Sequence, residues 1–296
     1  MLSKRKPSTI HAAESHLKIQ IIPNLGELPL DQIGPENLQT FISRIGGTIA
    51  RKTLLNVLRT LSSMLTTAKN WGYTCEGVQF NKLVLPGREM KRRAPTFTGE
   101  QGGQIIACAG GQFKVMFALA AMAGLRAGEI VGLQVNDFDF EPRLLQIQRS
   151  VWRGKLQTPK SVFSEAMLPM PAQLAELVRK HIATLQPGQE FLFLNSRGHL
   201  FIAENVVRQE LVPILDALKI PRCGFHAFRH AHTSLLLASG AAPTLAQAQL
   251  RHSDARITLG IYGHVIGNSH REAAEKVAAI LDSNGLNGEP VTKTIQ

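Results

Sequence analysis

A break in hydrophobic periodicity after the first third of the chain constrains its fold most. Residues 82–97 read KLVLPGREMKRRAPTF, which is rich in Lys, Arg, Pro and Gly and shows neither helical nor alternating apolar spacing. Such a composition is typical of a linker. The 296 residues exceed one typical domain, and 44% of them are apolar, enough for ordinary hydrophobic cores. We expect domains at 1–81 and 98–284, joined by the basic linker 82–97 and followed by a polar tail, 285–296.

The charge distribution points to a polyanionic partner. The formal net charge is +11, and residues 1–95 carry 14 Lys and Arg against 6 Asp and Glu, whereas residues 96–296 carry 19 against 16. A basic excess of this kind favours nucleic acid, although basic surfaces also occur on proteins that bind nothing. In the linker, Lys91, Arg92 and Arg93 are either a solvated tether or a segment that crosses a duplex backbone.

The first domain is predicted to be helical. Residues 8–21 open with Ser8 or Thr9 as an N-cap and are expected to end their helix at Pro23, and further helices are expected at about 35–45 and 50–70. In the last of these, basic side chains stand off the apolar stripe, as they do on a helix laid against phosphates or against solvent. These candidate DNA contacts are Lys52, Arg59 and Lys69.

The second domain is predicted to be mainly α with a small antiparallel β-meander. The meander is expected from LLQIQRSV, LQTPKSV and AMLPM, where apolar residues alternate between Gly and Pro punctuation. The segment FKVMFALAAMAG is almost uniformly apolar, so it should be a buried helix that ends at Gly124. Helices are expected at about 99–109, 112–123, 171–185, 203–218 and 269–282.

Targeting and redox signals are absent from the sequence. No run of about eighteen apolar residues occurs, and the basic start MLSKRK is not followed by an apolar region, so we expect a cytoplasmic protein without a membrane partner. The three cysteines, Cys75, Cys108 and Cys223, are far apart and odd in number, which favours reduced thiols over disulfides or a zinc site.

Chemistry-bearing residues gather between Gly224 and His264 at spacings that packing does not require. His226, His230 and His232 could share a metal-binding helix face, but no H-E-x-x-H and no carboxylate-rich segment accompanies them, so we predict neither metal nor any other cofactor. Tyr262 is one of only two tyrosines, and the other, Tyr73, looks like a packing residue beside a tryptophan at a helix end.

This stretch resembles the C-terminal signature of the tyrosine recombinases, or phage-type integrases: an H-x-x-R helix, an L-G-H turn, and a tyrosine about ten residues later. AGLRAGEIVGL matches the arginine motif of that family, QTPKS its hairpin lysine, and HAFRH, QLRHSD and TLGIYGH the rest. The matches run in order over about residues 105–265, and the first domain looks like the helical, SAM-like core-binding domain. The implied catalytic residues are Arg126, Lys160, His226, Arg229, His252 and the nucleophile Tyr262, with Glu129 and His264 in support.

The resemblance implies a two-domain, C-shaped DNA clamp that acts as a site-specific recombinase on double-stranded recombination sites. Tyr262 would form a 3′-phosphotyrosyl bond without metal or ATP, in a homotetramer on DNA, with an accessory DNA-bending protein as an optional partner. The residue types suit this chemistry, because guanidinium forks match phosphate oxygens and a tyrosine hydroxyl needs cations nearby to attack at neutral pH. Lys160 would protonate the leaving oxygen, and Lys155 is its rival.

Two positions depart from the family pattern. Arg251 stands where the L-G-H turn has glycine, and Ala166 stands where the hairpin often has arginine. These departures leave open a catalytically silent DNA-binding protein of the same fold. A DNA-relaxing enzyme of the type IB topoisomerase kind also stays open, because that class shares the catalytic set. The chain begins at the expected core-binding helices, so no further N-terminal arm-binding domain is expected.

Overall fold

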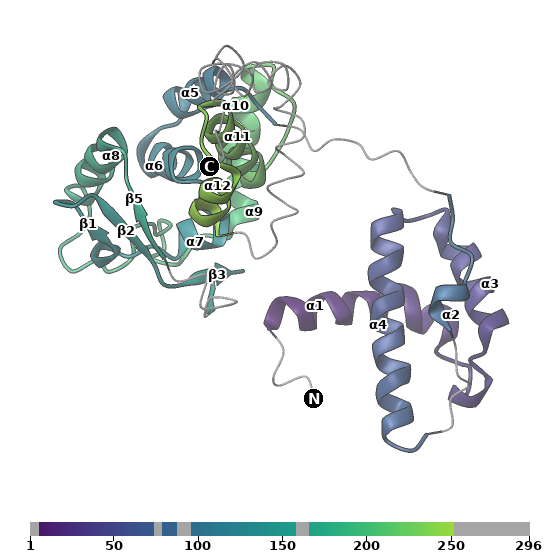
Figure 1. Cartoon of the computed structure of the whole chain (residues 1–296). Coiled ribbons are helices and arrows are strands. Elements are labelled where there is room, and N and C mark those ends of the chain that lie inside the picture. The colour runs from purple at the N-terminus through teal and green to yellow at the C-terminus, as the bar shows by residue number, and fades with distance from the viewer. Residues whose placement is uncertain (1–5, 74–78, 88–95, 158–165, 252–296) are drawn as a thin grey trace, which may run out of the picture. The chain divides into compact units, whose positions relative to one another are not determined.

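The computed structural model describes residues 6–73, 79–87, 96–157 and 166–251. The chain divides into two compact units, residues 1–93 and 94–296 (Figure 1). Each unit has its own hydrophobic core. Among the described helices, none has both the length and the apolar character that a membrane span requires.

The first unit is built from helices around a small leucine- and isoleucine-rich core. The apolar stripes of α3 and α4 are buried, and Leu38, Leu54 and Val57 are fully excluded from solvent. Short 3₁₀ turns occupy Leu30–Gln32 and Phe80–Lys82. The helices are α1 (Pro7–His16), α2 (Ile22–Leu25), α3 (Pro35–Gly46) and α4 (Arg51–Asn70).

The prediction that the first helix ends at Pro23 is wrong. A π-helical turn, Leu17–Ile21, follows α1 directly, and α2 continues through Pro23 to Leu25. Proline lacks the N–H of a helical hydrogen bond, and a wider turn just before it relieves the clash that proline causes in a regular α-helix. The same solution recurs in the second unit, where a π-helical turn, Val207–Leu211, precedes Pro213.

The second unit is organised around α6 (Gly111–Met122), which packs against α5 (Gly99–Cys108), α8 (Ala172–Ile182) and α11 (Phe225–Ala238) (Figure 1). Phe117 of α6 stacks on Phe228 of α11, with ring centroids 5.6 Å apart. A reciprocal pair of hydrogen bonds between Thr98 and Gln101 caps the start of α5. The remaining helices are α7 (Ala127–Val131), α9 (Ala203–Val206), α10 (Val212–Ala217) and α12 (Pro243–Leu250).

Over the described residues, the strands form two small antiparallel sheets, not the single meander expected from the sequence. One sheet has the order β1-β2-β5, and β3 and β4 make a separate hairpin. LLQIQRSV splits into two strands, and Arg149, which lies between them, donates to Asp137 at 2.6 Å. The strands are β1 (Phe138–Asp139), β2 (Leu144–Ile147), β3 (Ser150–Trp152), β4 (Lys155–Gln157) and β5 (Ala166–Pro169).

The predicted fold class is confirmed, since the described chain is mainly helical with small antiparallel sheets. The helix expected at about 269–282 lies outside the described residues.

Candidate active site

The loop between α6 and α7 begins the candidate site. Gly124 adopts φ +62°, and a side chain there would lie 2.8 Å from Leu250 and 2.9 Å from the ring of His232, so only glycine fits. Arg126 follows as the N-cap of α7, and Glu129 three residues later accepts its backbone N–H at 2.8 Å. The side chain of Arg126 also donates to Glu129 at 2.8 Å and remains 37% exposed.

Helix α11 carries Arg229 into the same place from a distant part of the sequence. Its guanidinium is buried and donates to the carbonyl oxygens of Gly124, at 2.6 Å, and Leu250. The hydroxyl of Thr233, one turn later, donates to the Arg229 carbonyl at 2.7 Å. Two backbone carbonyls on different segments therefore set the direction of the Arg229 fork.

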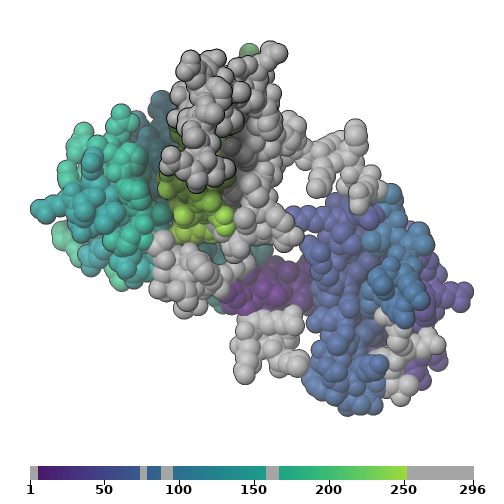
Figure 2. All heavy atoms as spheres, in the orientation of Figure 1, coloured from purple at the N-terminus to yellow at the C-terminus, as the bar shows by residue number. Residues whose placement is uncertain are grey.

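Helix α12 brings a third arginine. Arg251 ends the helix in the left-handed conformation, with φ 53° and ψ 47°, and its buried side chain donates to Glu129 at 2.7 Å. Its carbonyl oxygen accepts a hydrogen bond of 3.1 Å from Arg126. In the space-filling view, α12 comes to the surface of the second unit, drawn in yellow-green (Figure 2).

One carboxylate thus lies among three guanidinium groups. Burial alone would raise the pKa of Glu129, but the charges of Arg251 and Arg126 and the hydrogen bonds from Arg126 hold it below its usual value. Burial and the charge of Arg126 lower the pKa of Arg229, to about 9, which leaves it protonated at neutral pH. The cluster keeps an excess of positive charge in a partly desolvated place, where it can bind a phosphate or another oxyanion.

His226 lies in the first turn of α11, within electrostatic reach of this cluster. Partial burial, followed by the charges of His230, Arg229 and Arg126, lowers the pKa of His226. A neutral imidazole at neutral pH can accept a proton. His232 is instead part of the packing, since its Nδ1 lies 2.8 Å from the carbonyl oxygen of Ala121. Within the described ranges, no group of three or more His, Cys, Asp or Glu side chains is placed to hold a metal ion.

The hairpin of β3 and β4 packs directly on α7. A methyl group on Gly128 would lie 2.6 Å from both the Val151 carbonyl oxygen and the Ser150 hydroxyl oxygen, so the absence of a side chain permits this contact. Lys155 is exposed at the start of β4, opposite Trp152. Lys160 lies outside the described residues, eight positions after the last residue of β3.

The structure therefore brings together Arg126, Glu129 and Arg229, with His226 nearby. Sequence reasoning noted Arg251 as a departure from the family pattern and missed its contact with Glu129, 122 positions earlier in the sequence. The only signal for it was the basic residue itself in a position that favours glycine. Of the other predicted site residues, His252, Tyr262, His264, Lys91, Arg92 and Arg93 lie outside the described part of the chain.

The predicted DNA-contacting residues of the first unit lie on α4. Lys52, Arg59 and Lys69 are all exposed, and Arg59 donates to the side chain of Asn56 at 3.0 Å. Arg59 also lines a groove of about 660 Å³ between α1 and α4. Tyr73 lines the same groove and is 58% exposed, so the expectation that it is a packing residue is wrong; it follows the turn at Gly72, beyond the last core leucine of α4.

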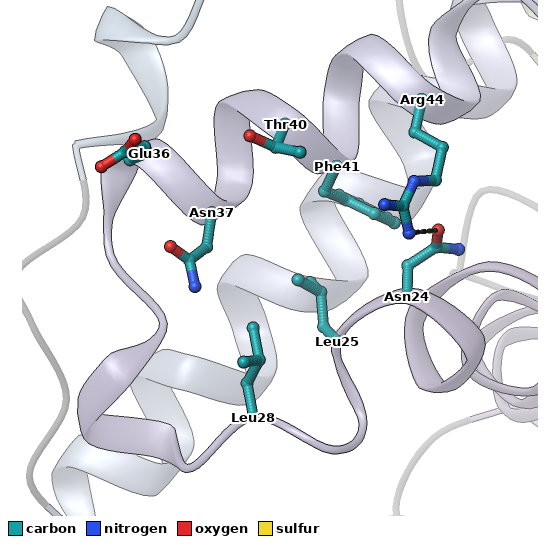
Figure 3. Close-up of a pocket in the computed structure, with 8 residues that line it drawn as sticks. All are labelled: Asn24, Leu25, Leu28, Glu36, Asn37, Thr40, Phe41 and Arg44. Carbon is teal, nitrogen blue, oxygen red and sulfur yellow. Dashed lines mark hydrogen bonds between the residues drawn. The ribbon is translucent and has the colours of Figure 1, made fainter.

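A smaller hollow of about 290 Å³ lies between α2 and α3 (Figure 3). On its rim, Arg44 donates to Asn24 at 3.4 Å, and Leu25 and Phe41 form its apolar wall. It holds one carboxylate, Glu36, and none of the predicted catalytic residues.

The chain is similar to known proteins along most of its length. Residues 97–268 match the model of the phage integrase family, and residues 2–45 match that of the phage integrase N-terminal SAM-like domain. The chain is 27% identical to a "tyrosine recombinase XerC-like" protein of Caldanaerobacter subterraneus subsp. tengcongensis, over 92% of this chain and 78% of the relative. It is 21% identical to the integrase of Staphylococcus phage L54a, over 86% of this chain and 82% of that protein.

Solved structures share the fold. The integrase of transposon Tn1549, in complex with transposon right end DNA, aligns with a TM-score of 0.77 at 20% identity, over 93% of this chain and 95% of that one. A lambda integrase dimer bound to a COC′ core site aligns with a TM-score of 0.69 at 18% identity, over 88% and 73% of the two chains.

Proposed function

Because this chain belongs to the phage integrase family of tyrosine recombinases, we propose that it cuts and rejoins DNA through a 3′-phosphotyrosyl bond to Tyr262. The chain is a site-specific DNA recombinase of the tyrosine type. We propose further that the reaction needs neither metal nor ATP, because the energy of the broken phosphodiester is kept in the covalent intermediate.

The observation that carries the proposal is the cluster of arginines around Glu129. Arg126 and Arg229 come from segments 103 positions apart, and each is oriented by contacts of 2.6–3.1 Å to groups that a folded chain keeps fixed. Charge that develops on the two non-bridging oxygens of a phosphodiester during attack is best stabilised by donors that are already in place. Surface arginines held only by solvent would not have this preorganisation.

The proposed reaction balances without a further reactant. The hydroxyl oxygen of Tyr262 attacks phosphorus, its proton passes to a neutral histidine, and the bond from phosphorus to the 5′-oxygen breaks. His226, with its lowered pKa, and His252 are the proposed acceptors. Lys160 gives a proton to the departing 5′-oxygen, and Glu129 and His264 support the cluster. Ligation is the same sequence in reverse.

Binding and assembly follow from the same proposal. The first unit and the linker would bind the duplex backbone through Lys52, Arg59, Lys69, Lys91, Arg92 and Arg93. Four protomers on two recombination sites would exchange strands in pairs, and an accessory DNA-bending protein would assist where the site requires one. We propose residues 1–81 as the core-binding domain, 98–284 as the catalytic domain and 285–296 as a polar tail.

A nicked suicide duplex tests the nucleophile. The wild-type protein should give a protein–DNA adduct that survives denaturing electrophoresis, and Tyr262→Phe should give none while its DNA affinity stays within about threefold, since only one oxygen is lost. Tyr73→Phe is the matched control and should form adduct normally. An adduct from Tyr262→Phe, or loss of adduct in Tyr73→Phe, would refute the assignment.

The same assay separates the two rival functions. Site binding by the wild-type protein without any adduct would indicate a silent DNA-binding protein. Relaxation of supercoiled DNA without sequence preference and without pairing of sites would indicate a topoisomerase-like enzyme.

A further inference from the structure

Arg251 occupies a backbone conformation that suits glycine. It ends α12 with φ 53°, and its N–H closes the last turn on the carbonyl oxygen of Ala248 at 3.0 Å. A side chain costs free energy in this conformation, so its presence needs a compensating interaction. Arg143 has the same φ of 53° but lies exposed on the surface, where solvent hydrates its guanidinium.

The side chain of Arg251 is almost completely buried, with 3% of its surface exposed. Its Nη2 donates to Glu129 at 2.7 Å, and within the described part of the chain neither Nε nor Nη1 has a hydrogen-bond partner. A guanidinium buried with only part of its donors satisfied is costly unless a carboxylate holds it. Glu129 is that carboxylate.

Arg126, Glu129 and Arg251 form a closed ring of contacts. Glu129 binds the backbone N–H and the side chain of Arg126, and it also binds the side chain of Arg251. Arg126 in turn donates to the carbonyl oxygen of Arg251 at 3.1 Å. The ring joins the start of α7 to the end of α12 through one bond to a main-chain carbonyl and one bond between side chains.

We propose that Arg251 is a positioning residue, which acts through Glu129 to hold Arg126 in its phosphate-binding orientation and to fix the end of α12. The inference rests on the proposed function, because it concerns the same reaction. With glycine at this position, the bond from Arg126 to the main-chain carbonyl would be the one contact of the ring that still joins the two segments, and Glu129 would pair with Arg126 alone.

The extra guanidinium also changes the charge of the site. Glu129 pairs with two arginines, so it offsets the electrostatic field of Arg126 less than it would in a single ion pair. Counted formally, three guanidinium groups and one carboxylate give the cluster a net charge of +2, one more than it would have with glycine. The added charge therefore stabilises the transition state, in which negative charge develops on the phosphodiester oxygens.

Arginine-to-glycine variants at two left-handed positions test the proposal. Arg251→Gly should slow single-turnover cleavage of a nicked duplex between about tenfold and a hundredfold, the scale of a small misplacement, while DNA affinity stays within about threefold. Arg251→Lys keeps a cation for Glu129 and should recover part of the rate. Arg143→Gly, which relieves the same backbone conformation without removing a buried ion pair, should cleave like the wild type.

A double-mutant cycle asks whether Arg251 acts through Glu129. Glu129→Gln leaves Arg251 buried without a carboxylate, so its effect on the cleavage rate should be at least about fivefold larger in the wild type than in Arg251→Gly. Additive effects, a wild-type rate in Arg251→Gly, or an equal loss in Arg143→Gly would overturn the proposal.

The same cycle measured on the free energy of unfolding requires no cleavage and separates the two proposals. If the wild-type protein forms no adduct, the proposed function fails. If the unfolding free energies of Arg251→Gly and Glu129→Gln are additive, the ring of contacts does not hold the two segments together, and the inference fails whatever the enzyme does.

Discussion

At the scale of single residues, the unusual feature is a carboxylate inside a proposed phosphate site. Glu129 repels a phosphate by its charge, yet it accepts three hydrogen bonds from two arginines and is almost completely buried. Its contribution is to orientation. An arginine held on one edge by Glu129 presents its remaining edge in a fixed direction, which a freely rotating side chain cannot do.

This geometry predicts that Arg126→Lys and Arg229→Lys each lose at least about a hundredfold in cleavage rate. An ammonium is a point charge, so it can neither make the two parallel bonds of a fork nor keep the contacts that orient it. Single-turnover cleavage of a nicked duplex measures the loss.

Arg222→Lys is the matched control, because Arg222 also makes a two-pronged contact, at 2.8 Å to each oxygen of Asp216, but on the surface. It should cleave at the wild-type rate. Near-normal rates in Arg126→Lys or Arg229→Lys would mean that the residue acts through its positive charge alone and not through directed hydrogen bonds.

Lys160 can be tested by chemistry that bypasses it. Lys160→Ala should cleave ordinary DNA at least about a hundredfold more slowly, the usual scale for a lost general acid. A substrate with sulfur in place of the 5′-oxygen needs no proton on its leaving group, so it should restore most of that rate. It should restore little of the rate lost by Arg126→Ala, whose defect concerns the non-bridging oxygens.

Lys155→Ala is the control for position on the hairpin and should cleave both substrates normally. Equal rescue of Lys160→Ala and Arg126→Ala would remove Lys160 from this role, as would a defect and rescue found in Lys155→Ala alone.

At the scale of elements, the contact between α7 and the β3–β4 hairpin depends on a missing side chain. Gly128→Ala would place a methyl group 2.6 Å from the Val151 carbonyl oxygen, so helix and hairpin must separate. We expect a loss of about 1–3 kcal/mol in unfolding free energy, the usual cost of forced overpacking. Cleavage should fall as well, because Lys160 follows the last residue of β4 by only three positions in the sequence.

Gly103→Ala is the opposite case, since Gly103 lies in α5 with nothing within 4 Å of an added methyl group. It should stabilise the protein by about 0.5–1 kcal/mol through helix propensity. Chemical denaturation of both variants checks the pair; equal stability changes would show that the close approach at Gly128 is easily relaxed.

Sequence patterns identified the elements whose information is local. Apolar residues at three- and four-residue steps located α3 and α4, and Gly124 stops α6 in the left-handed conformation as expected. The division of the described strands into two sheets was not predicted, because strand pairing joins residues that are distant in the sequence, and alternation of apolar residues does not encode the partner. The continuation of the helix through Pro23 was missed, since a proline in a sequence normally predicts a helix end. The helix expected at about 203–218 does run through Pro213, but its π-helical turn was not predicted.

The candidate site shows the same division. Arg126, Glu129 and Arg229 were predicted from the resemblance to the family, which rests on the order and spacing of several short motifs together. The contact of Arg251 with Glu129 joins segments far apart in the sequence, and no local pattern encodes which carboxylate a buried arginine meets. Only the folded structure shows that Arg251 and Glu129 form an ion pair.

At the scale of the whole molecule, the excess positive charge should govern DNA affinity. Neutralising Lys91, Arg92 and Arg93 together should flatten the plot of log affinity against log salt by about 0.9 for each phosphate that the variant no longer neutralises, up to about three phosphates. Arg222→Gln is the control, because Asp216 already neutralises its charge, and the slope should not change. An unchanged slope in the triple variant would place the linker away from DNA.

The two separate hydrophobic cores have a consequence for how such proteins diversify. All described members of the proposed catalytic cluster, Arg126, Glu129, Arg229 and Arg251, lie in the second unit, and their contacts are made within it. Substitutions in the first unit can therefore accumulate without disturbing the groups proposed to handle the phosphate. The proposed catalytic groups can therefore stay the same in evolution while the first unit changes and the protein comes to recognise a different DNA site.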